Sequence, residues 1–362
     1  MLSIIVPTYC EEENIHPVVA RIRAALDSKL DYEIVFVDDN SPDKTVERVG
    51  ELQKQGAPVR IIVRKDERGL CSAILRGFRE ARGDLLLCMD ADLSHPPEAI
   101  PDMVQAQKQN QADMVIGSRY VAGGKTEEGW GLFRWLNSRV AGLLARPLTA
   151  VRDAMTGFFV MPRSVFERAK DLNPIGYKFA LELIIKCPCR NVVEIPIFFA
   201  DRQHGESKLS LAEQARYILH LKRLYDYRYG KASRFIQFCL IGASGIIVNL
   251  LVYSILLKLG LQEGLAYALA IWVSLTWNFV PNRYLTFDLT SQQPVWPQYG
   301  RFVVTCSLGA VVNWLITMTL SHQGGWFDQH KLFAALIGIA AGTIFNFMIS
   351  HEWAFRAARV RK

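Results

Sequence analysis

The first 230 residues or so alternate short apolar runs with longer stretches of mixed polarity. The apolar runs lie at residues 2–6, 33–37, 59–63, 85–89 and 113–117 and have the length of buried strands. The stretches between them, at about residues 12–28, 44–55, 70–81 and 97–110, have the length and polarity of surface helices. This alternation predicts an α/β domain with a mainly parallel sheet and helices on both faces.

From about residue 235 the pattern changes to long uncharged segments. Residues 235–257, 264–280, 302–320 and 332–350 contain no charged side chain. Each segment is close to the roughly 20 residues that a helix needs to span a bilayer. One such segment could be a buried helix of a soluble protein, but four in succession predict membrane spans. We therefore expect an α/β domain at residues 1–232 and an all-α four-helix transmembrane domain at residues 233–362.

The membrane half contains an internal repeat. The pattern RFxxxCxxGA occurs at 234–243 and at 301–310, and the pattern NFxxxxxxxF begins at Asn278 and again at Asn346, with offsets of 67 and 68 residues. Two copies of a two-helix hairpin explain polar residues that recur in register. We expect the asparagines of the spans to face neighbouring helices, and the glycines to allow close helix approach. These residues are Asn249, Asn278, Asn313, Asn346, Gly242, Gly245, Gly309, Gly338 and Gly342.

The charged residues indicate an orientation. The chain of 362 residues has a net charge of +7, and its Lys and Arg residues gather before the first span, between the second and third, and after the last. This distribution favours a lipid surface over nucleic acid as the partner, and it predicts that both termini face the cytoplasm. The short apolar start has no basic leader, so the first domain is also expected in the cytoplasm. The seven cysteines form no disulfide or zinc pattern.

A predicted helix at about residues 211–230 joins the two halves. Its periodicity places Leu211, Ala215, Ile218 and Leu221 on one face, and Glu213, Arg216, His220 and Arg223 on the other. A helix of this kind can lie along the lipid headgroups and hold the first domain there. Docking on the first domain is the alternative.

Polar side chains follow three of the predicted strands. The sequences are PTYCE after residue 6, DDNS after residue 37 and DAD after residue 89. Because ligands bind at the carboxyl ends of the strands in open parallel sheets, these groups predict one site. Asp90 and Asp92 could instead cap the helix that begins near Pro96, but Ser94 is already placed to do so.

The chemistry of this site can be narrowed. The chain has neither a GxxxxGK[ST] loop nor a GxGxxG sequence after the first strand, so a nucleotide diphosphate would need a cation. A D-x-D sequence supplies two oxygen ligands of the kind that Mg²⁺ or Mn²⁺ prefers. The residues alone leave open which aspartate binds a metal and which binds a sugar.

Six stretches together carry a resemblance to a known family. In order, IIVPTYCEEENI, EIVFVDDNSPDKT, MDADLSHPPE, IGSRYVAGG, DAMTGFF and FADRQHGESKLS resemble family-2 glycosyltransferases, in particular the dolichol-phosphate (polyprenol-phosphate) mannose synthases. The resemblance covers about residues 1–232 and implies the Rossmann-like GT-A fold. It also implies an inverting transfer of mannose from GDP-mannose to a dolichyl or polyprenyl phosphate, with Mg²⁺ or Mn²⁺. The membrane half resembles GtrA-like four-helix domains.

The resemblance also implies roles for individual residues. Those expected to hold the guanosine part are Pro7, Tyr9, Glu11, Val37 and Asp39. Those expected at the diphosphate and the metal are Asp90, Ala91 and Asp92, with Ser94 as a further metal candidate where several relatives have glutamine. Arg202 and Lys208 would clamp the diphosphate. Trp130, Arg134 and Ser138, with Arg119, would grip the acceptor phosphate, and the residues expected to act in the transfer itself are Asp92, Arg119, Arg134 and Ser138.

Physical chemistry agrees with this reaction. A phosphate acceptor is already anionic at neutral pH and needs no general base, so alignment and charge neutralisation suffice. His95 and His204 are accordingly expected to be local hydrogen-bonding groups. Two alternatives stay open: transfer of glucose or another sugar, and translocation of a lipid-linked sugar as the main role of the membrane half.

Overall fold

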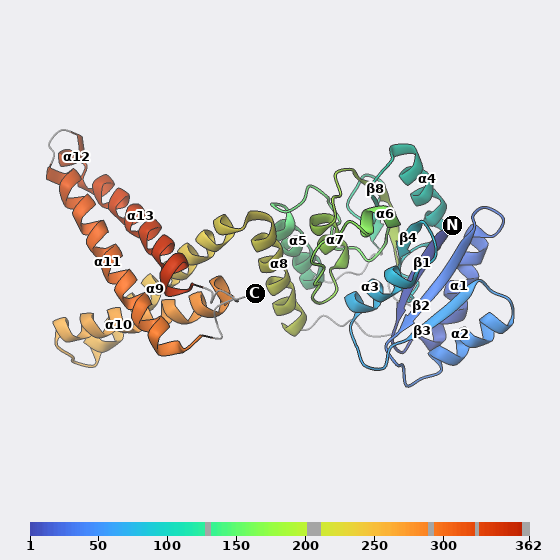
Figure 1. The fold of residues 1–362 in the computed structure, drawn as a ribbon, viewed down its shortest axis with the longest axis horizontal. Coiled ribbons are helices and arrows are strands. Elements are labelled where there is room, and N and C mark those ends of the chain that lie inside the picture. The colour runs from blue at the N-terminus through green and yellow to red at the C-terminus, as the bar shows by residue number, and fades with distance from the viewer. Residues whose placement is uncertain (127–131, 201–210, 289–292, 323–325, 357–362) are drawn as a thin grey trace, which may run out of the picture. The chain divides into compact units, whose positions relative to one another are not determined.

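A computed structural model describes residues 1–126, 132–200, 211–288, 293–322 and 326–356 (Figure 1). The chain folds as two compact units, Met1–Arg228 and Tyr229–Lys362, and each is described by itself.

The first unit is built on a seven-stranded sheet in the order β3-β2-β1-β4-β7-β5-β8. All neighbouring strands run parallel except β7, which is antiparallel to both β4 and β5. The five predicted strands are present, and β7 and β8 complete the sheet. The predicted α/β fold of the GT-A kind is therefore confirmed. The strands are β1 (Leu2–Thr8), β2 (Tyr32–Asp38), β3 (Val59–Val63), β4 (Leu85–Cys88), β5 (Met114–Ser118), β7 (Phe159–Pro162) and β8 (Val192–Pro196), and a separate pair joins β6 (Lys125–Thr126) to β9 (Phe198–Phe199).

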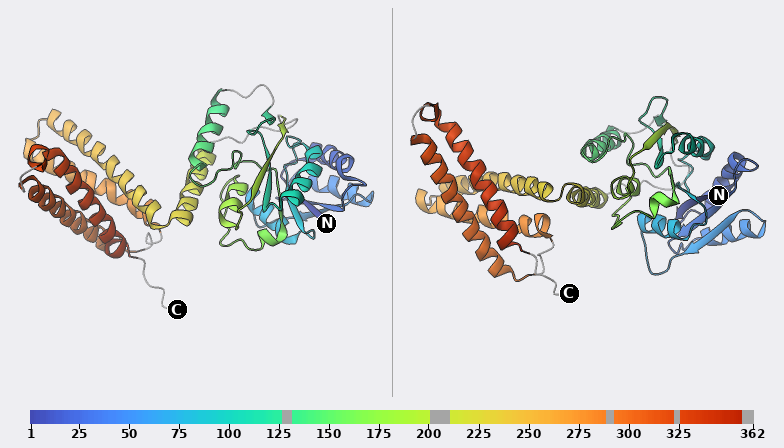
Figure 2. Two further views of the ribbon diagram at one scale, coloured as in Figure 1. Left: turned by 90° about the horizontal axis from the view of Figure 1, so that it is seen from above. Right: turned by 45° about the horizontal axis from the view of Figure 1, so that its top comes forward.

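Helices cover both faces of this sheet, as Figures 1 and 2 show. Ile4 and Val6 of β1 point into a core with α1 and α4, whereas Ile5 points to the opposite face and packs with α3 and α7. Because both faces of the central strands are buried, the middle residues of β1, β2 and β4 are apolar on both faces, which is typical of parallel sheets. The helices are α1 (Glu12–Leu26), α2 (Thr45–Lys54), α3 (Leu70–Glu80), α4 (Ile100–Asn110) after the 3₁₀ turn Pro97–Ala99, α5 (Leu132–Ala145), α6 (Arg163–Phe166), α7 (Phe179–Lys186) and α8 (Leu211–Tyr229).

Helix α8 docks on the first unit, which was the alternative to a purely interfacial helix. Leu221 and Leu224 are buried in the core shared with α3 and α7. His220 Nε2 lies 2.6 Å from Glu182 Oε2 on α7, and both side chains are fully buried. The Tyr217 and Tyr225 hydroxyls donate to the carbonyls of Ala141 and Leu144 on α5, at 2.7 and 2.8 Å. Helices α5, α7 and α8 therefore form one layer.

The predicted division of α8 into faces is wrong at three positions. His220, expected on the polar face, is buried, whereas Ala215 and Ile218, expected on the apolar face, are exposed. The reason is Glu182: a buried carboxylate needs donors, and His220 and Lys186 supply them. Burial raises the pKa of Glu182, but hydrogen bonds from His220, Lys186 and the Asn173 N–H outweigh this effect, so its pKa is lowered overall.

Among the described residues of the second unit, four helices are long and apolar enough to cross a membrane: Lys231–Lys258, Glu263–Thr286, Val295–His322 and Lys331–Ala354. They comprise α9 (Lys231–Lys258), α10 (Glu263–Pro281), α11 (Val295–His322) and α13 (Lys331–Ile349), with the short α12 (Trp326–Gln329) between the last two. Both α10 and α13 end in a π-helical turn, Asn282–Thr286 and Ser350–Ala354. These turns are 68 residues apart, so the sequence repeat is also a structural repeat.

Aromatic contacts relate the two hairpins by an approximate two-fold axis. Phe287 and Phe355, which occupy matching positions of the repeat, stack on each other with centroids 4.6 Å apart and planes at 9°. Phe279 lies 5.9 Å from Phe355, and its counterpart Phe347 lies 6.3 Å from Phe287. Such reciprocal contacts are the mark of an isologous, two-fold interface.

The asparagines of the spans contact neighbouring helices, as predicted. A Cβ atom built on Gly245 would overlap Asn278 of α10, and one built on Gly309 would overlap Asn346 of α13. Asn313 lies in the same way against Gly338. Gly245, Gly309 and Gly338 therefore let polar side chains meet neighbouring backbones inside the bundle, whereas the close approach expected at Gly242 is not found, because nothing lies within 4 Å of a Cβ atom built there. For Asn249 the contact stays a prediction.

A matched pair of glycine substitutions tests this packing. Gly309→Ala should lower the melting temperature of the detergent-solubilised chain, because overpacking a close contact costs about 1–3 kcal/mol. Gly242, its counterpart in the first hairpin, has nothing within 4 Å of its would-be Cβ atom. Gly242→Ala should therefore leave the melting temperature unchanged or raise it slightly. Equal shifts for the two variants would show that the Gly309–Asn346 contact does not matter.

Candidate active site

The polar strand ends meet at one edge of the sheet, as predicted. Strands β2, β1 and β4 are parallel neighbours, so their carboxyl ends lie side by side. A non-glycine residue with positive φ follows each of them: Cys10 at 59°, Asn40 at 57° and Leu93 at 62°. Such conformations cost about 1–3 kcal/mol each and cluster at functional sites.

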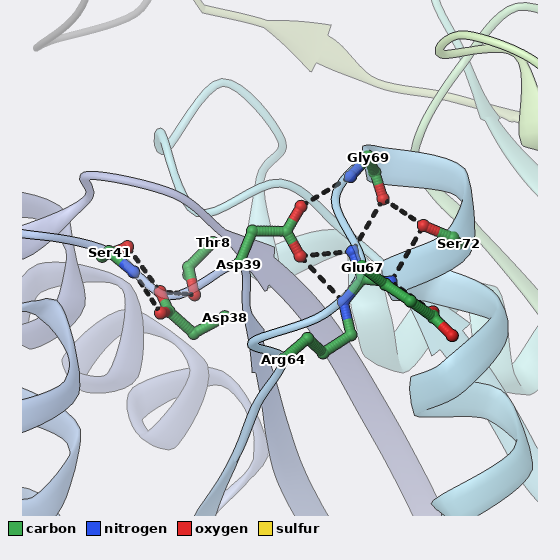
Figure 3. A network of polar contacts seen from close by, with 8 residues as sticks. All are labelled: Thr8, Asp38, Asp39, Ser41, Arg64, Glu67, Gly69 and Ser72. Atoms are coloured by element: carbon green, nitrogen blue, oxygen red, sulfur yellow. Dashed lines mark hydrogen bonds and ion pairs between the residues drawn. The ribbon is translucent and has the colours of Figure 1, made fainter.

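A hydrogen-bonded network fixes the ends of β1 and β2 (Figure 3). Asp38 accepts from the Thr8 hydroxyl at 3.0 Å and from the backbone N–H and hydroxyl of Ser41 at 2.8 and 2.6 Å. Asp39 Oδ1 accepts from Arg64 Nε at 2.8 Å and from Arg64 Nη2, while Oδ2 accepts from the Gly69 N–H at 2.7 Å. The two carboxylates therefore have fixed orientations.

The five residues expected at the guanosine part lie around this network. Pro7 pairs in register with Val37, one position before the Asp38–Asp39 pair. Tyr9 is 38% exposed, with the Arg68 guanidinium 5.5 Å from its ring centroid, and Glu11 accepts from the Asn14 side chain at 2.7 Å. Pro7 and Val37 thus lie on paired strands, and Tyr9, Glu11 and Asp39 follow them at the same edge. The Val37 side chain is buried in the core, and contact of the five residues with a nucleoside stays a prediction.

The D-x-D sequence follows β4. Ala91 and Asp92 are buried, whereas the Asp90 side chain is 31% exposed. Asp92 Oδ1 accepts from the Ser94 hydroxyl at 2.6 Å and from its N–H at 3.1 Å. Ser94 thus orients Asp92, and its own role as a metal ligand stays a prediction.

Arg119 directly follows β5 and forms a bidentate pair with Asp153. Arg119 Nε and Nη2 each lie 2.8 Å from an Asp153 carboxylate oxygen, and the Arg119 N–H donates to Asp153 at 3.0 Å. Glu194 on β8 accepts from the N–H groups of Arg152 and Asp153 at 2.9 and 3.0 Å. Burial lowers the pKa of Arg119, but Asp153 outweighs this effect and raises it overall. The guanidinium is therefore charged and rigidly placed.

Two small features connect the D-x-D turn to Arg119. A Cβ atom on Gly157 would lie 3.3 Å from Asp90 Oδ1, so glycine forms the floor beside Asp90. The Phe199 ring contacts the Arg119 guanidinium at 5.0 Å and the His95 ring at 5.5 Å. The ends of β4, β7 and β5 therefore enclose one site.

Three further residues of this edge were not found from the sequence. Asp153 and Arg64 hold predicted site residues, and Lys178 precedes α7. The pKa of Lys178 is lowered by burial and by Arg119, with Asp153 and Asp90 acting in the opposite direction. Two signals were present in the sequence: Arg64 directly follows a predicted strand, and Asp153 opens the DAMTGFF motif.

Several predicted residues are only partly placed. Arg134 and Ser138 lie four residues apart on α5, but their side chains fall outside the described part. Arg139 of the same helix lies 5.9 Å from the Tyr120 ring, and Arg119 lies 5.3 Å from that ring, so α5 passes beside Arg119. Trp130, Arg202, His204 and Lys208 lie outside the described residues, although Ala200 donates to the Ser94 carbonyl at 3.2 Å.

The carboxylates at the D-x-D turn fit a divalent cation. In the described ranges no group of three or more His, Cys, Asp or Glu side chains could hold a metal alone. Mg²⁺ commonly binds through one or two carboxylates together with water and substrate phosphates, which agrees with Asp90 and Asp92 as the protein's share.

Comparisons with known proteins agree with this geometry. Residues 3–169 match the family described as glycosyl transferase family 2, and residues 237–355 match the GtrA/DPMS transmembrane domain. A protein of Pyrococcus furiosus named dolichol-phosphate mannosyltransferase is 40% identical over 359 residues, which cover 98% of this chain and 99% of that protein. Proteins of the same name from Mycosarcoma maydis and Saccharomyces cerevisiae are 44% and 42% identical over 63% of this chain and over 80% and 88% of their own length.

Solved structures also match part of the chain. Glucosyl-3-phosphoglycerate synthase from Mycobacterium tuberculosis, crystallised with Mn²⁺, UDP-glucose and phosphoglyceric acid, aligns with 62% of this chain and 79% of its own at 19% identity and a TM-score of 0.48.

Proposed function

The chain belongs to the dolichol-phosphate mannosyltransferases, and we propose that it transfers mannose from GDP-mannose to a dolichyl or polyprenyl phosphate. It is a membrane glycosyltransferase that makes polyprenyl phosphate mannose. The identity of the donor as GDP-mannose is the part of the proposal that goes beyond this shared activity.

One observation carries this proposal: Arg119 and the D-x-D turn lie at the same sheet edge with β7 between their strands. Two strand spacings amount to about 10 Å. A leaving diphosphate near Asp90 and an attacking phosphate near Arg119 can therefore flank one sugar ring. The floor between them contains Gly157, which leaves the space beside Asp90 open.

The residues of the chain act mainly by position and charge. Arg119, held by Asp153, attracts the acceptor phosphate and aligns its oxygen with the anomeric carbon. That phosphate is already ionised, so no side chain needs to remove a proton. Mg²⁺ or Mn²⁺, bound by Asp90 and Asp92, would neutralise charge that develops on the leaving diphosphate.

We also propose that the active site faces the cytoplasmic leaflet. Leu143 of α5 is 70% exposed, and Ile218 and Leu219 of α8 are 53% and 45% exposed, although the two helices are hydrogen-bonded to each other. These apolar side chains support contact of this layer with the lipid. The excess of Lys and Arg before the first span and after the last supports cytoplasmic termini.

Cysteine labelling tests this orientation. Leu259→Cys, between α9 and α10, should react with an impermeant reagent added to intact cells, whereas Trp296→Cys, at the start of α11, should react only after permeabilisation. Both positions are well exposed, at 71% and 81%. Each variant is compared with the parent chain, whose native cysteines give the background. The reverse pattern would overturn the proposed orientation.

The reaction itself is tested with the purified full chain. Labelled GDP-mannose and UDP-glucose are each offered with a polyprenyl phosphate and with Mg²⁺ or Mn²⁺. We expect a labelled lipid product from GDP-mannose and little from UDP-glucose. Transfer from UDP-glucose alone would replace mannose by glucose, and absence of transfer from either donor would favour translocation as the main role.

A further inference from the structure

We infer that His95 is a positioning residue for the D-x-D turn: its Nδ1 atom accepts the Asp90 backbone N–H and so sets the carboxylate of Asp90 toward the metal and the diphosphate. This inference rests on the proposed function. The sequence indicated only that His95 is a local hydrogen-bonding group.

The His95 ring has one well-defined position. The Asp90 N–H donates to Nδ1 at 3.0 Å, and the side chain is buried. The ring stacks on Phe158, with centroids 5.2 Å apart and planes at 14°, and meets the edge of Phe199 at 5.5 Å. A Cβ atom on Gly157 would lie 3.3 Å from His95 Cε1, so a larger residue at 157 would press on the ring.

The geometry fixes the tautomer of His95. A backbone N–H can only donate, so Nδ1 must offer its lone pair and the neutral ring carries its proton on Nε2. Asp90 Oδ2 is 3.7 Å from Nδ1, which is too far for a hydrogen bond. His95 therefore acts on the backbone of Asp90 and not on its carboxylate.

The turn needs such a support. Leu93 has a φ of 62°, a conformation that L side chains rarely adopt, so the turn is held by interactions outside its own backbone. Ser94 binds the carboxylate of Asp92, and His95 binds the backbone of Asp90. The two residues that follow the turn therefore fix its two aspartates separately.

Two substitutions separate this role from ordinary packing. His95→Asn places a side-chain oxygen near the position of Nδ1 and can keep the acceptor, but it loses the ring that stacks on Phe158. His95→Phe keeps an aromatic ring there and removes the acceptor. If His95 only packs, activity should rank in the same order as stability, so His95→Phe should be both more stable and more active than His95→Asn. The positioning role predicts the opposite order of activity.

The test measures Mn²⁺ binding by the purified full chain with GDP present, the melting temperature, and KM and kcat for GDP-mannose. We expect His95→Phe to melt at or above the temperature of His95→Asn but to bind Mn²⁺ roughly 10- to 100-fold more weakly than the parent chain. His95→Asn should keep an Mn²⁺ affinity close to that of the parent.

The outcomes distinguish failure of the His95 role from failure of the proposed function. One outcome is that the parent chain binds Mn²⁺ and transfers mannose while the Mn²⁺ affinity and activity of the two variants rank in the same order as their melting temperatures. In that case the role of His95 is overturned and the proposed function stands. If the parent chain itself neither binds Mn²⁺ nor uses GDP-mannose, both are overturned.

Discussion

Asp92→Asn is expected to abolish mannosyl transfer and to leave the fold of the chain intact. Asparagine keeps an oxygen that can accept from Ser94, which lies 2.6 Å from Asp92 Oδ1, but it removes one charge and one oxygen ligand. We expect a loss of about a thousandfold in kcat/KM, or about 4 kcal/mol, because transition-state charge is no longer neutralised. Asp92→Ala should lose transfer to the same extent.

Asp84 provides a matched control on the same strand. It lies at the amino end of β4, its side chain is 92% exposed, and Asp84→Asn makes the same chemical change. Transfer rates with GDP-mannose and the melting temperatures of both variants are compared with those of the parent. Full activity of purified Asp92→Asn would remove Asp92 from the site, whereas an equal loss for Asp84→Asn would point to a general effect of charge.

The second large effect concerns the Arg119–Asp153 pair. Asp153→Ala leaves the Arg119 guanidinium without its carboxylate in a site where Asp153 is 1% exposed. Removing one partner of a buried pair costs about 3–5 kcal/mol of stability. We therefore expect a clearly lower melting temperature together with loss of transfer. The double variant Arg119→Met, Asp153→Leu should recover much of the stability and none of the transfer.

The exposed pair of Arg21 and Glu98 is the control for this experiment. It has the same bidentate geometry, at 2.9 and 2.8 Å, but its side chains are 37% and 58% exposed. Glu98→Ala should cost less than about 1 kcal/mol. A melting temperature of Asp153→Ala as high as that of Glu98→Ala would contradict the buried pair.

Measuring GDP-mannose affinity distinguishes residues that bind the acceptor phosphate from residues that bind the donor. Arg119→Ala and Arg134→Ala should impair use of the acceptor phosphate and leave GDP-mannose affinity nearly unchanged. An equal loss of GDP-mannose affinity would move Arg119 to the donor side of the site.

The sheet edge was predictable from the sequence because of a simple physical rule. Buried parallel strands are continuous apolar runs, and their carboxyl ends share one edge. The groups after β1, β2 and β4 therefore had to meet, and they do. The four spans were equally plain, since length and lack of charge suffice to identify them.

The features that the sequence did not predict depend on contacts between segments far apart in the chain. Asp153 lies 34 residues after Arg119 in an irregular stretch, and no periodicity links the two. The orientation of α8 is set by Glu182, 38 residues before His220. A helical wheel ranks residues by hydropathy and cannot include a buried carboxylate on another helix. Strand β7 was missed because it inserts antiparallel between β4 and β5 and follows an irregular stretch, outside the regular alternation of strands and helices.

The stack of Phe287 on Phe355 bears on how the membrane half could arise and diverge. If a single hairpin formed a dimer with a second, identical copy, the two equivalent phenylalanines would stack on each other. Because both copies would have the same sequence, every other position would also be the same in both. Joining the copies in one gene removes that restriction. Arg283 and His351 occupy matching places in the two π-helical turns, and so do Tyr284 and Glu352. The duplicated frame thus keeps its shared aromatic centre while each half acquires different polar residues around it.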